Sequence, residues 1–430
     1  MGWAEGPKEW RPRPETTNGG AFQNRMSKVA NRLAGTAPNR GFSLPPALLA
    51  VTSNRGSSYL PCPARTSPAD VPRRSGQQRQ SMSGITIVGS GRYLPGVAFS
   101  NDDLARVMDT SDEWIRQRTG IERRHFCPDG QGASDLALPA ARLALESAGR
   151  TAADVDYILF NTMTPDHILP GSGPLLGAKL GCPGTPALDI RTQCAAMIYS
   201  FQLADALLKS DAIRSVLVIG AEAHAGFMPW RDWRALEGTE RADAREFERA
   251  TRHRDYAVIF GDGAGALLLE RSTEEGKGLL SVDVHSDGRY ADELFIPAGF
   301  RRRPYATAAM AEDEEFLPRM NGREVFRHAV SKLPQTVRVA CERAGVTLDD
   351  IEWFIAHQAN DRINRLVRER LGVPPEKVPS NIANYGNTSA ATIPILVDEM
   401  RRDGRLRTGQ LVCFLALGAG LHWGAAVMRL

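Results

Sequence analysis

The sequence predicts an α/β fold made of two units that follow one another along the chain. Its strand-like segments are continuous apolar runs, such as SVLVIGAE and LVCFLALG, rather than alternating patterns. Runs of this kind are typical of sheets covered by helices on both faces, and helix-like segments lie between them. The same succession of strands and helices occurs twice. The two rounds meet near residues 271–278, which indicates an internally duplicated core without a clear sequence repeat.

The first half, residues 83–274, is expected to open with a buried strand and a glycine turn at 85–95. Two short helices follow, and the second is expected to open at Thr110, because Glu113 stands three residues later in the spacing of a capping box. Apolar periodicity places the other elements: helices at 133–148, at 171–179 and from about 194, strands at 155–165, 186–190 and 215–224, and a strand, glycine turn and strand at 256–270.

Residues 226–256 interrupt this succession, because they are dense in charged side chains and have only a weak helical period. A solvated surface insertion is the first interpretation. Trp230 and Trp233, beside Pro229, support a substrate-covering lid as the alternative.

The second half, residues 275–430, repeats the succession. It contains a long helix at 321–344, in which Pro334 predicts a kink. The other expected elements are strands at 278–286 and 351–360, helices at 361–371 and 388–404, and two apolar strands around a glycine turn at 410–430.

Residues 1–82 differ from the rest in composition. They are rich in Pro, Gly, Ser, Asn and Arg, and we expect them to be disordered. An upstream start codon, with the protein beginning at Met82, is preferred over an organelle transit peptide, since acidic residues stand early and no amphipathic helix is clear. Of the 53 basic and 50 acidic residues of the chain, 12 and 4 lie here, which leaves 41 and 46 in the remainder. The positive balance therefore belongs to the leader, and a basic, nucleic-acid-binding fold is not supported.

The composition excludes several other classes. With 42% hydrophobic and 24% charged residues, and no apolar run of about 18 residues, the chain has the make-up of an ordinary globular protein without a membrane span. The six cysteines lack metal-ligand spacing, so no metal is expected and a reducing, cytoplasmic setting is preferred. The glycine clusters at 89–96 and 260–266 lack the third glycine or the Lys-Ser/Thr pair of nucleotide sites, so no cofactor is expected either.

Cys194 is the candidate nucleophile. It stands between the apolar run at 187–190 and a long apolar helix, and a thiol there faces the unpaired N–H groups and the positive dipole end of that helix. Both favour the thiolate, which is the nucleophilic form. A small buried core residue is the other interpretation. Two residues favour the nucleophile: His357 follows an apolar run in IAHQAN, and Asn387 lies in the turn-rich NIANYGNTSAA.

Several motifs together resemble one known family. RYLP, TSDEWIRQRTGI, the cysteine at a strand–helix junction, FGDGAGA, HQAN, YGNTSAA and GAGLHWGA follow one another over residues 85–430. In this order they resemble β-ketoacyl-acyl carrier protein synthase III, a family of the thiolase superfamily. The pair HQAN and GNTSAA is the most specific part of the resemblance.

The resemblance implies a thiolase-like, five-layered α-β-α-β-α fold, a homodimer, and a decarboxylative Claisen condensation that starts fatty-acid or related lipid or polyketide chains. It implies that Cys194 holds an acyl primer delivered by acyl-CoA, and that its N–H and that of Ala419 form the oxyanion hole. His357 and Asn387 would stabilise the enolate formed from malonyl-acyl carrier protein.

The same matching implies substrate-binding and docking residues. The coenzyme A tunnel would be lined by Trp114, Arg118, Arg254 and Asn360, although Trp114 and Arg118 equally fit an ordinary half-buried helix face. Arg362, Arg365 and Arg368 would dock the acidic acyl carrier protein, and a solvated helix face is the alternative.

Four departures from the family pattern concern the substrate rather than the reaction. Gln193 precedes the cysteine where a small residue is common, and Leu169 replaces an aromatic residue that the partner subunit often contributes to the acyl pocket. Arg323 stands where Asn is frequent, and the insertion at 226–256 is long.

Two rival functions remain open at this point. One is an acyltransferase of the same fold that passes the acyl group to an oxygen or nitrogen nucleophile without decarboxylation. The other is a non-catalytic acyl-binding or scaffold protein.

Overall fold

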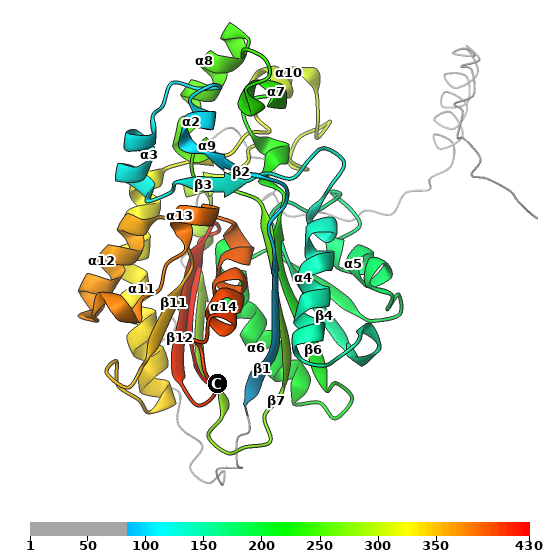
Figure 1. The fold of residues 1–430 in the computed structure, drawn as a ribbon, viewed down its shortest axis with the longest axis vertical. Helices are drawn as coiled ribbons and strands as arrows, with labels where there is room; N and C mark the ends of the chain where they lie inside the picture. Colours follow the sequence, from blue (N-terminus) through cyan, green and yellow to red (C-terminus); the bar gives the residue numbers. More distant parts are fainter. Residues whose placement is uncertain (1–83) are drawn as a thin grey trace, which may run out of the picture. The chain divides into compact units, whose positions relative to one another are not determined.

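The computed structural model describes residues 84–430, and the predicted leader at 1–82 lies outside the described residues. A mixed five-stranded sheet occupies the first half (Figure 1). Its strands are β1 (Ile85–Tyr93), β4 (Tyr157–Asn161), β5 (Ala187–Ile190), β6 (Ser215–Glu222) and β7 (Gly263–Arg271). They lie in the order β1-β7-β6-β4-β5, with β4 parallel to β5 and β6, and β7 antiparallel to β6 and β1.

A mixed four-stranded sheet occupies the second half. Its strands are β8 (Gly278–Ser286), β11 (Trp353–Ala356), β12 (Leu411–Gly418) and β13 (His422–Arg429). They lie in the order β11-β12-β13-β8, with one parallel pair, β11 and β12, followed by two antiparallel pairs. This is the pairing scheme of β4-β6-β7-β1 in the first sheet, so the predicted duplication is confirmed in the topology, with β5 as an additional edge strand.

The helices form three layers around the two sheets. The helices of these layers are α4 (Ala133–Ser147), α5 (Ser172–Leu180), α6 (Ala196–Leu208), α11 (Gly322–Ala344), α12 (Asp361–Leu371) and α14 (Thr392–Arg402). Figure 1 shows α4 and α5 outside the first sheet, α6 and α14 between the sheets, and α11 and α12 outside the second. The α-β-α-β-α succession expected from the family resemblance is therefore present.

Each central strand buries both of its faces, as the continuous apolar runs predict. In β6, Val216 and Val218 pack into the central cluster with α6 and α14, while Leu217 and Ile219 pack into the outer cluster with α4. Strand β12 alternates in the same way between the central cluster and the outer cluster of α11 and α12. Successive side chains of a strand point to opposite faces, so only a run without polar interruptions fills both layers.

The remaining elements are short. They are the helices α2 (Asn101–Leu104), α3 (Asp112–Thr119), α7 (Trp233–Glu237), α8 (Ala244–Arg252), α9 (Arg254–Ala257), α10 (Ala308–Glu312) and α13 (Ile382–Tyr385), the strand pairs β2 (Ala98–Ser100) with β3 (Arg123–His125) and β9 (Leu294–Phe295) with β10 (Arg319–Met320), and the 3-10 turns at Ala152–Asp154, Gln193–Ala195, His224–Phe227, Gly288–Glu293, Pro375–Lys377 and Ser389–Ala391.

Two local predictions are wrong. The expected strand at 256–260 is the end of helix α9 followed by a loop, and only Phe260 forms a single bridge to Asn387. Its residues are apolar because they pack into a buried cluster, and a short apolar run does not by itself distinguish a strand from a helix end. Helix α3 is capped by Ser111 rather than Thr110, since the Ser111 hydroxyl accepts from the N–H of Trp114 at 3.2 Å.

The insertion at 226–256 folds into α7 and α8. Trp230 is buried, and its ring lies edge-on to Phe126 with 5.8 Å between centroids, while Trp233 lies 5.2 Å from the same ring. Charged side chains cover much of α8, so the solvated interpretation fits its outer face. The two tryptophans pack into the protein interior, which removes the observation that favoured a lid.

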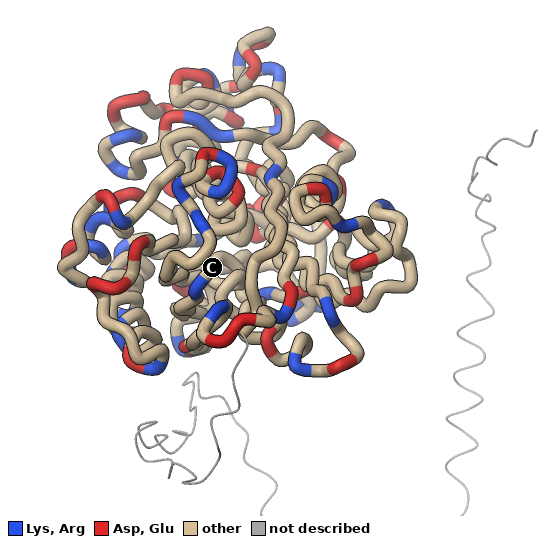
Figure 2. The backbone as a smooth tube through the Cα atoms, turned by 60° about the horizontal axis from the view of Figure 1, so that its bottom comes forward, with Lys and Arg blue, Asp and Glu red and all other residues tan. Residues whose placement is uncertain are grey.

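Charged side chains lie on the outer elements of the described residues. Figure 2 shows Lys and Arg interspersed with Asp and Glu over the surrounding helices and loops. None of the described helices is both long enough and apolar enough to cross a bilayer.

Candidate active site

Cys194 lies where strand β5 turns into helix α6. Gln193–Ala195 form a single 3-10 turn, and α6 begins directly after it. The φ angle of Gln193 is 49°, a left-handed conformation that residues other than glycine seldom adopt, so the chain enters the helix through a sharp turn. The cysteine is 7% exposed. The strand–helix junction predicted from the sequence is thus present, and the thiol is nearly enclosed.

Strand β12 approaches the backbone of Cys194 at Gly418. A Cβ atom at position 418 would lie 2.8 Å from the amide nitrogen of Cys194 and 3.0 Å from the carbonyl oxygen of Thr192. These distances are far inside van der Waals contact with backbone atoms, so only glycine permits the approach. Ala419 follows Gly418 directly, in the turn between β12 and β13.

One short segment, residues 387–392, connects the three candidate catalytic residues. The Sγ of Cys194 lies 3.3 Å from the Oγ of Ser389, and the N–H of Ser389 donates to the Oδ1 of Asn387 at 2.8 Å. At the other end, the Oγ1 of Thr392 lies 2.7 Å from the Nδ1 of His357. Residues 163 and 193 positions beyond Cys194 in the sequence are therefore connected to it through this one segment.

Thr392 also bears on which nitrogen of His357 carries the proton. The Thr392 hydroxyl has one proton and two acceptors nearby, the Nδ1 of His357 at 2.7 Å and the carbonyl of Ser389 at 3.0 Å. The two donations exclude each other: a hydroxyl proton directed to Nδ1 leaves the imidazole proton on Nε2, whereas donation to the Ser389 carbonyl leaves it on Nδ1. Nε2 is buried and has no hydrogen-bond partner among the described residues, so it is a free donor whenever it carries the proton.

His357 is electrically neutral in this site. The residue is 4% exposed, and burial lowers its pKa to about 3. A neutral imidazole next to an amide donates hydrogen bonds without a net charge of its own.

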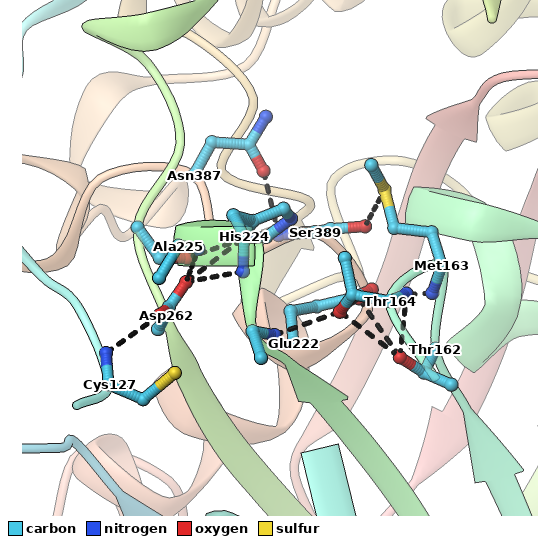
Figure 3. Close-up of polar contacts among 12 residues, drawn as sticks. Cys127, Thr162, Met163, Thr164, Glu222, His224, Ala225, Asp262, Asn387 and Ser389 are labelled. Carbon is cyan, nitrogen blue, oxygen red and sulfur yellow. Dashed lines mark hydrogen bonds and ion pairs between the residues drawn. The ribbon is translucent and has the colours of Figure 1, made fainter. Parts of the chain in front are cut away.

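Asn387 is held so that its amide nitrogen is available. Its Oδ1 accepts from Ser389, its N–H donates to the carbonyl of Ile259 at 2.9 Å, and its own carbonyl accepts from Gly261 at 3.1 Å. In Figure 3 the oxygen of the Asn387 side chain points to Ser389, and the nitrogen points away from it. The amide orientation is thereby fixed, with the Nδ2 donors directed away from the contact that orients them.

Glu222, at the end of β6, binds the segment 387–392 through its buried carboxylate. It is fully buried, and its carboxylate accepts from the hydroxyls of Thr162 and Thr164, at 3.1 and 2.8 Å, and from the N–H of Ala390 at 3.3 Å. Figure 3 shows these contacts beside Met163, whose sulfur lies 3.3 Å from the Oγ of Ser389. The carboxylate therefore ties β4 and β6 to the chain segment that carries Asn387.

The sequence-based expectation of a thiolate at Cys194 is corrected by the structure. Burial raises the pKa of the thiol to about 12, and the negative charge of Glu222 acts in the same direction. The hydrogen bond from Ser389 and the backbone N–H lower the pKa, but by less than burial raises it. The resting residue is consequently a thiol, because desolvation outweighs the helix N-terminus in this enclosed site.

A cavity of about 490 Å³ opens beside the catalytic residues. Trp114, Arg118 and Asn360, all predicted for coenzyme A, line it. The guanidinium groups of Arg118 and Arg254 lie 4.3 and 4.8 Å from the centroid of the Trp114 ring. Arg254, the remaining residue predicted for coenzyme A, therefore packs on Trp114. The wall includes Ile259, whose carbonyl binds Asn387, so the cavity lies next to the catalytic segment.

The other predicted residues are exposed or half-buried, and only Arg362 among them lines this cavity. Leu169 is 77% exposed in the loop between β4 and α5 and is absent from the lining of this cavity. Arg362 and Arg365 are exposed on α12 and Arg368 is half-buried, with the Arg362 side chain lining the cavity as well. Among residues 84–430, no group of His, Cys, Asp or Glu is placed to hold a metal ion.

Comparison with known proteins identifies the family. Two family models match, 3-oxoacyl-[acyl-carrier-protein] synthase III over residues 188–240 and 242–288, and its C-terminal counterpart over residues 341–430. The β-ketoacyl-[acyl-carrier-protein] synthase III of Rhodospirillum rubrum is 42% identical over 349 residues, which cover 80% of this chain and 98% of that protein. The chain belongs to the β-ketoacyl-[acyl-carrier-protein] synthase III family. It is an acyltransferase of this condensing type, as the motifs indicate.

Solved structures agree with this assignment. The 3-oxoacyl-[acyl-carrier-protein] synthase III from Aquifex aeolicus VF5 superposes with a TM-score of 0.69 at 35% identity, over 81% of this chain and all of that one. The priming β-ketosynthase of the R1128 polyketide pathway also has a TM-score of 0.69, at 29% identity, over 80% of this chain and 96% of that one. The thiolase-like fold expected for the family is thereby confirmed.

Sequence reasoning missed the residues that connect this synthase site. Ser389 lies just before α14 and Thr392 is its first residue, and the next five residues of the helix are apolar. Polar residues at the start of such a run are a visible signal, yet their contacts to Cys194 and His357 depend on the tertiary fold. Glu222 is an acidic residue at the end of the wholly apolar run 215–221, and a buried charge at a strand end is also a signal that the sequence carries.

Proposed function

We propose that this chain condenses an acyl primer, delivered by acyl-CoA and held on Cys194, with malonyl-acyl carrier protein, and thereby initiates fatty-acid or related lipid or polyketide chains. The observation that carries the proposal is the connection of Cys194, Asn387 and His357 through Ser389 and Thr392. A thiol, a neutral imidazole and an oriented amide on one segment match the requirements of acyl transfer followed by enolate formation.

In the first step the Cys194 sulfur attacks the carbonyl carbon of the acyl-CoA. A carbon–sulfur bond to the enzyme forms, the bond to coenzyme A breaks, and coenzyme A leaves as a thiol with the proton that Cys194 loses. The N–H groups of Cys194 and Ala419 bind the oxyanion of the tetrahedral intermediate, a role supported by the close approach of Gly418. One such donor contributes on the order of 3 kcal/mol to transition-state stabilisation.

In the second step the malonyl group loses carbon dioxide. The electron pair of the broken carbon–carbon bond forms an enolate, and the Nε2–H of His357 and the Nδ2–H of Asn387 donate to its oxygen. The enolate carbon then attacks the acyl carbon on Cys194, and the sulfur leaves as a thiolate that takes a proton from solvent. Neutral donors suit this step, because a carboxylate in their place would repel the enolate.

Intact-protein mass spectrometry tests the first step. Incubation with a panel of acyl-CoAs should add the mass of one acyl group, and Cys194→Ala should remove this addition. Release of carbon dioxide from malonyl-acyl carrier protein tests the second step. Acyl transfer without carbon dioxide release would indicate the acyltransferase alternative, and a protein that is never acylated would indicate the scaffold alternative.

We further propose that the enzyme works as a cytoplasmic homodimer. Strand β5 is an edge of the first sheet, and exposed apolar side chains lie on it, at Leu188, and in the loop before α5, at Ile168 and Leu169. An exposed edge strand with apolar neighbours is a suitable surface for pairing with a second copy. In such a dimer Leu169 would extend toward the acyl pocket of the partner. The five described cysteines are free thiols, as in a reducing compartment.

The carrier protein is proposed to dock on helix α12. Arg365 is exposed and makes no ion pair among the described residues, and Arg362 connects the helix surface with the cavity mouth. An acidic partner would bind such a surface, with an affinity that falls as ionic strength rises.

A further inference from the structure

The turn between β12 and β13 contacts Cys194 through one glycine and the ring of His422 through another. Gly418 lies against the amide nitrogen of Cys194. A Cβ atom at position 420 would overlap the imidazole of His422, so this ring lies directly over Gly420. Ala419, whose N–H is proposed to bind the oxyanion, stands between the two glycines. The position of the His422 ring therefore bears on the backbone that carries this donor.

Three hydrogen bonds hold the His422 ring. Its Nδ1 lies 2.8 Å from the Oγ of Ser286, and this Oγ lies 2.8 Å from the hydroxyl oxygen of Tyr199. The Tyr199 hydroxyl in turn lies 2.6 Å from the backbone carbonyl of His285. The rings of Tyr199 and His422 also meet edge-on, with 5.8 Å between centroids. Tyr199 lies on α6, five residues after Cys194, so this Tyr199–Ser286–His422 network connects the helix of the nucleophile with the turn.

The carbonyl at the end of the network determines the direction of each hydrogen bond. A carbonyl has no proton, so Tyr199 donates to it, and the Tyr199 oxygen is left to accept from Ser286. Ser286 then has no proton to give to His422, and the Nδ1–H of His422 donates to the Ser286 oxygen. Burial lowers the pKa of His422, so the ring is neutral at pH 7.5 and its one proton is on Nδ1.

The end of β8 anchors the turn at two neighbouring residues. His422 and Ser286 are opposite one another in the pairing of β13 with β8. The next residues, Leu421 and Asp287, exchange two backbone hydrogen bonds, at 3.1 and 2.9 Å. Among residues 84–430, none of the three side chains of the network bonds to a candidate catalytic side chain, and none lines the cavity of about 490 Å³. The network therefore acts on the turn rather than on a bound substrate.

We infer that His422, through its hydrogen bond to Ser286 and Tyr199, positions the turn that carries the Ala419 N–H and thereby sets the geometry of the oxyanion hole. The inference rests on the proposed function of Cys194 and Ala419. His422 is a positioning residue, since it takes no part in bond making. Its position matters because a donor stabilises an oxyanion only within hydrogen-bond distance, and a displacement of about 1 Å can lower a rate on the order of a hundredfold.

The test measures acylation of Cys194 by intact mass, as a function of acetyl-CoA concentration, for the full chain and its variants. His422→Asn keeps a donor in place of Nδ1, because the amide nitrogen of Asn stands the same number of bonds from Cα. His422→Phe keeps a ring and removes the donor. Ser286→Ala removes the bridging hydroxyl, and Ser331→Ala, at an exposed serine of α11, is its matched control. The final acylated fraction counts the competent protein in each sample, so unfolded protein does not affect the rate.

His422→Phe and Ser286→Ala are expected to lower the acylation rate at saturating acetyl-CoA by about tenfold to a hundredfold, because the donor on the turn is displaced. The half-saturating concentration should not change, since neither residue lines the cavity. His422→Asn should restore most of the rate, and Ser331→Ala should match the wild type. Carbon dioxide release from malonyl-acyl carrier protein without a primer should be the same in all of them, because the oxyanion hole of acyl transfer is not used in that step.

Acylation of His422→Phe at the full rate would overturn the inference, because the ring alone would then suffice. If that variant does not fold, Ser286→Ala decides by the same criterion. A change only in the half-saturating concentration, an equal loss of carbon dioxide release, or no advantage of His422→Asn over His422→Phe would overturn it as well. If the wild type itself were never acylated, the proposed function would fail. A wild type that is acylated normally, with variants identical to it, would refute only the assignment of His422.

Discussion

The burial of His357 predicts a specific dependence of stability on pH. Its pKa in the folded protein is about 3, whereas the ordinary value is 6.5. Below pH 6.5 the unfolded chain binds a proton at this side chain that the folded protein does not bind. Stability rises with pH wherever the unfolded state binds more protons. The contribution of neutral His357 to the free energy of unfolding is therefore complete above pH 6.5, and it is lost progressively as the pH falls toward 3.

The size of the effect follows from the interval that is titrated. One pKa unit corresponds to about 1.36 kcal/mol, and pH 5 lies about 1.5 units below the unfolded value, which gives a loss of about 2 kcal/mol between pH 7.5 and pH 5. The side chain is almost fully enclosed, so solvent screening does little to reduce this value. Substitution of His357 by Asn, which retains hydrogen-bonding ability without a titrating ring, should remove it.

Urea unfolding at pH 7.5 and pH 5.0, at one protein concentration, measures this contribution. Other groups also titrate in this interval, so the informative quantity is the pH-dependent change in the free energy of unfolding of the wild type minus that of His357→Asn. We expect about 2 kcal/mol. Equal pH dependences in the two proteins would refute the reasoning, since His357 would then bind its proton equally well in the folded and unfolded states.

Three further predictions concern the residues around the nucleophile. Because the pKa of Cys194 is about 12, its alkylation by iodoacetamide, followed by peptide mass spectrometry, should rise about tenfold per pH unit without levelling off by pH 10, and a plateau near pH 8 would contradict the burial argument. Gly418→Ala should cost about 2 kcal/mol in urea unfolding and slow acylation, whereas Gly184→Ala, whose Cβ would meet no atom within 4 Å, should do neither. Thr392→Val should lower carbon dioxide release from malonyl-acyl carrier protein by about tenfold to a hundredfold while acylation stays normal, and unchanged release would show that the hydroxyl does not select the His357 tautomer.

The order of the core elements could be predicted from the sequence, because a strand that is buried on both faces appears there as a continuous apolar run. The run at 216–221 fills two apolar layers with alternate side chains, and no polar residue interrupts it before Glu222. The stretch at 256–260 carries a similar signal for a different reason, since Tyr256 and Phe260 are buried by packing against the insertion and α3. Local periodicity does not separate these two causes.

The residues of the site could be named from motifs, but their electrostatic state could not. The helix N-terminus at Cys194 is visible in the sequence and lowers the pKa of a thiol, while the walls that enclose it come from β12, from Met163 and from the segment around Ser389. Desolvation by distant segments is a property of the tertiary fold. The same is true of Thr392, whose effect on His357 depends on a contact between α14 and the end of β11.

The repeated pairing scheme of the two sheets places the candidate catalytic residues at equivalent positions of the two halves. Cys194 opens the inter-sheet helix of the first repeat, and Asn387 and Ser389 stand just before the corresponding helix of the second. Under the proposed mechanism, these two equivalent positions carry complementary tasks: one forms the covalent bond to the acyl group, and the other donates hydrogen bonds to the carbonyl of the malonyl thioester.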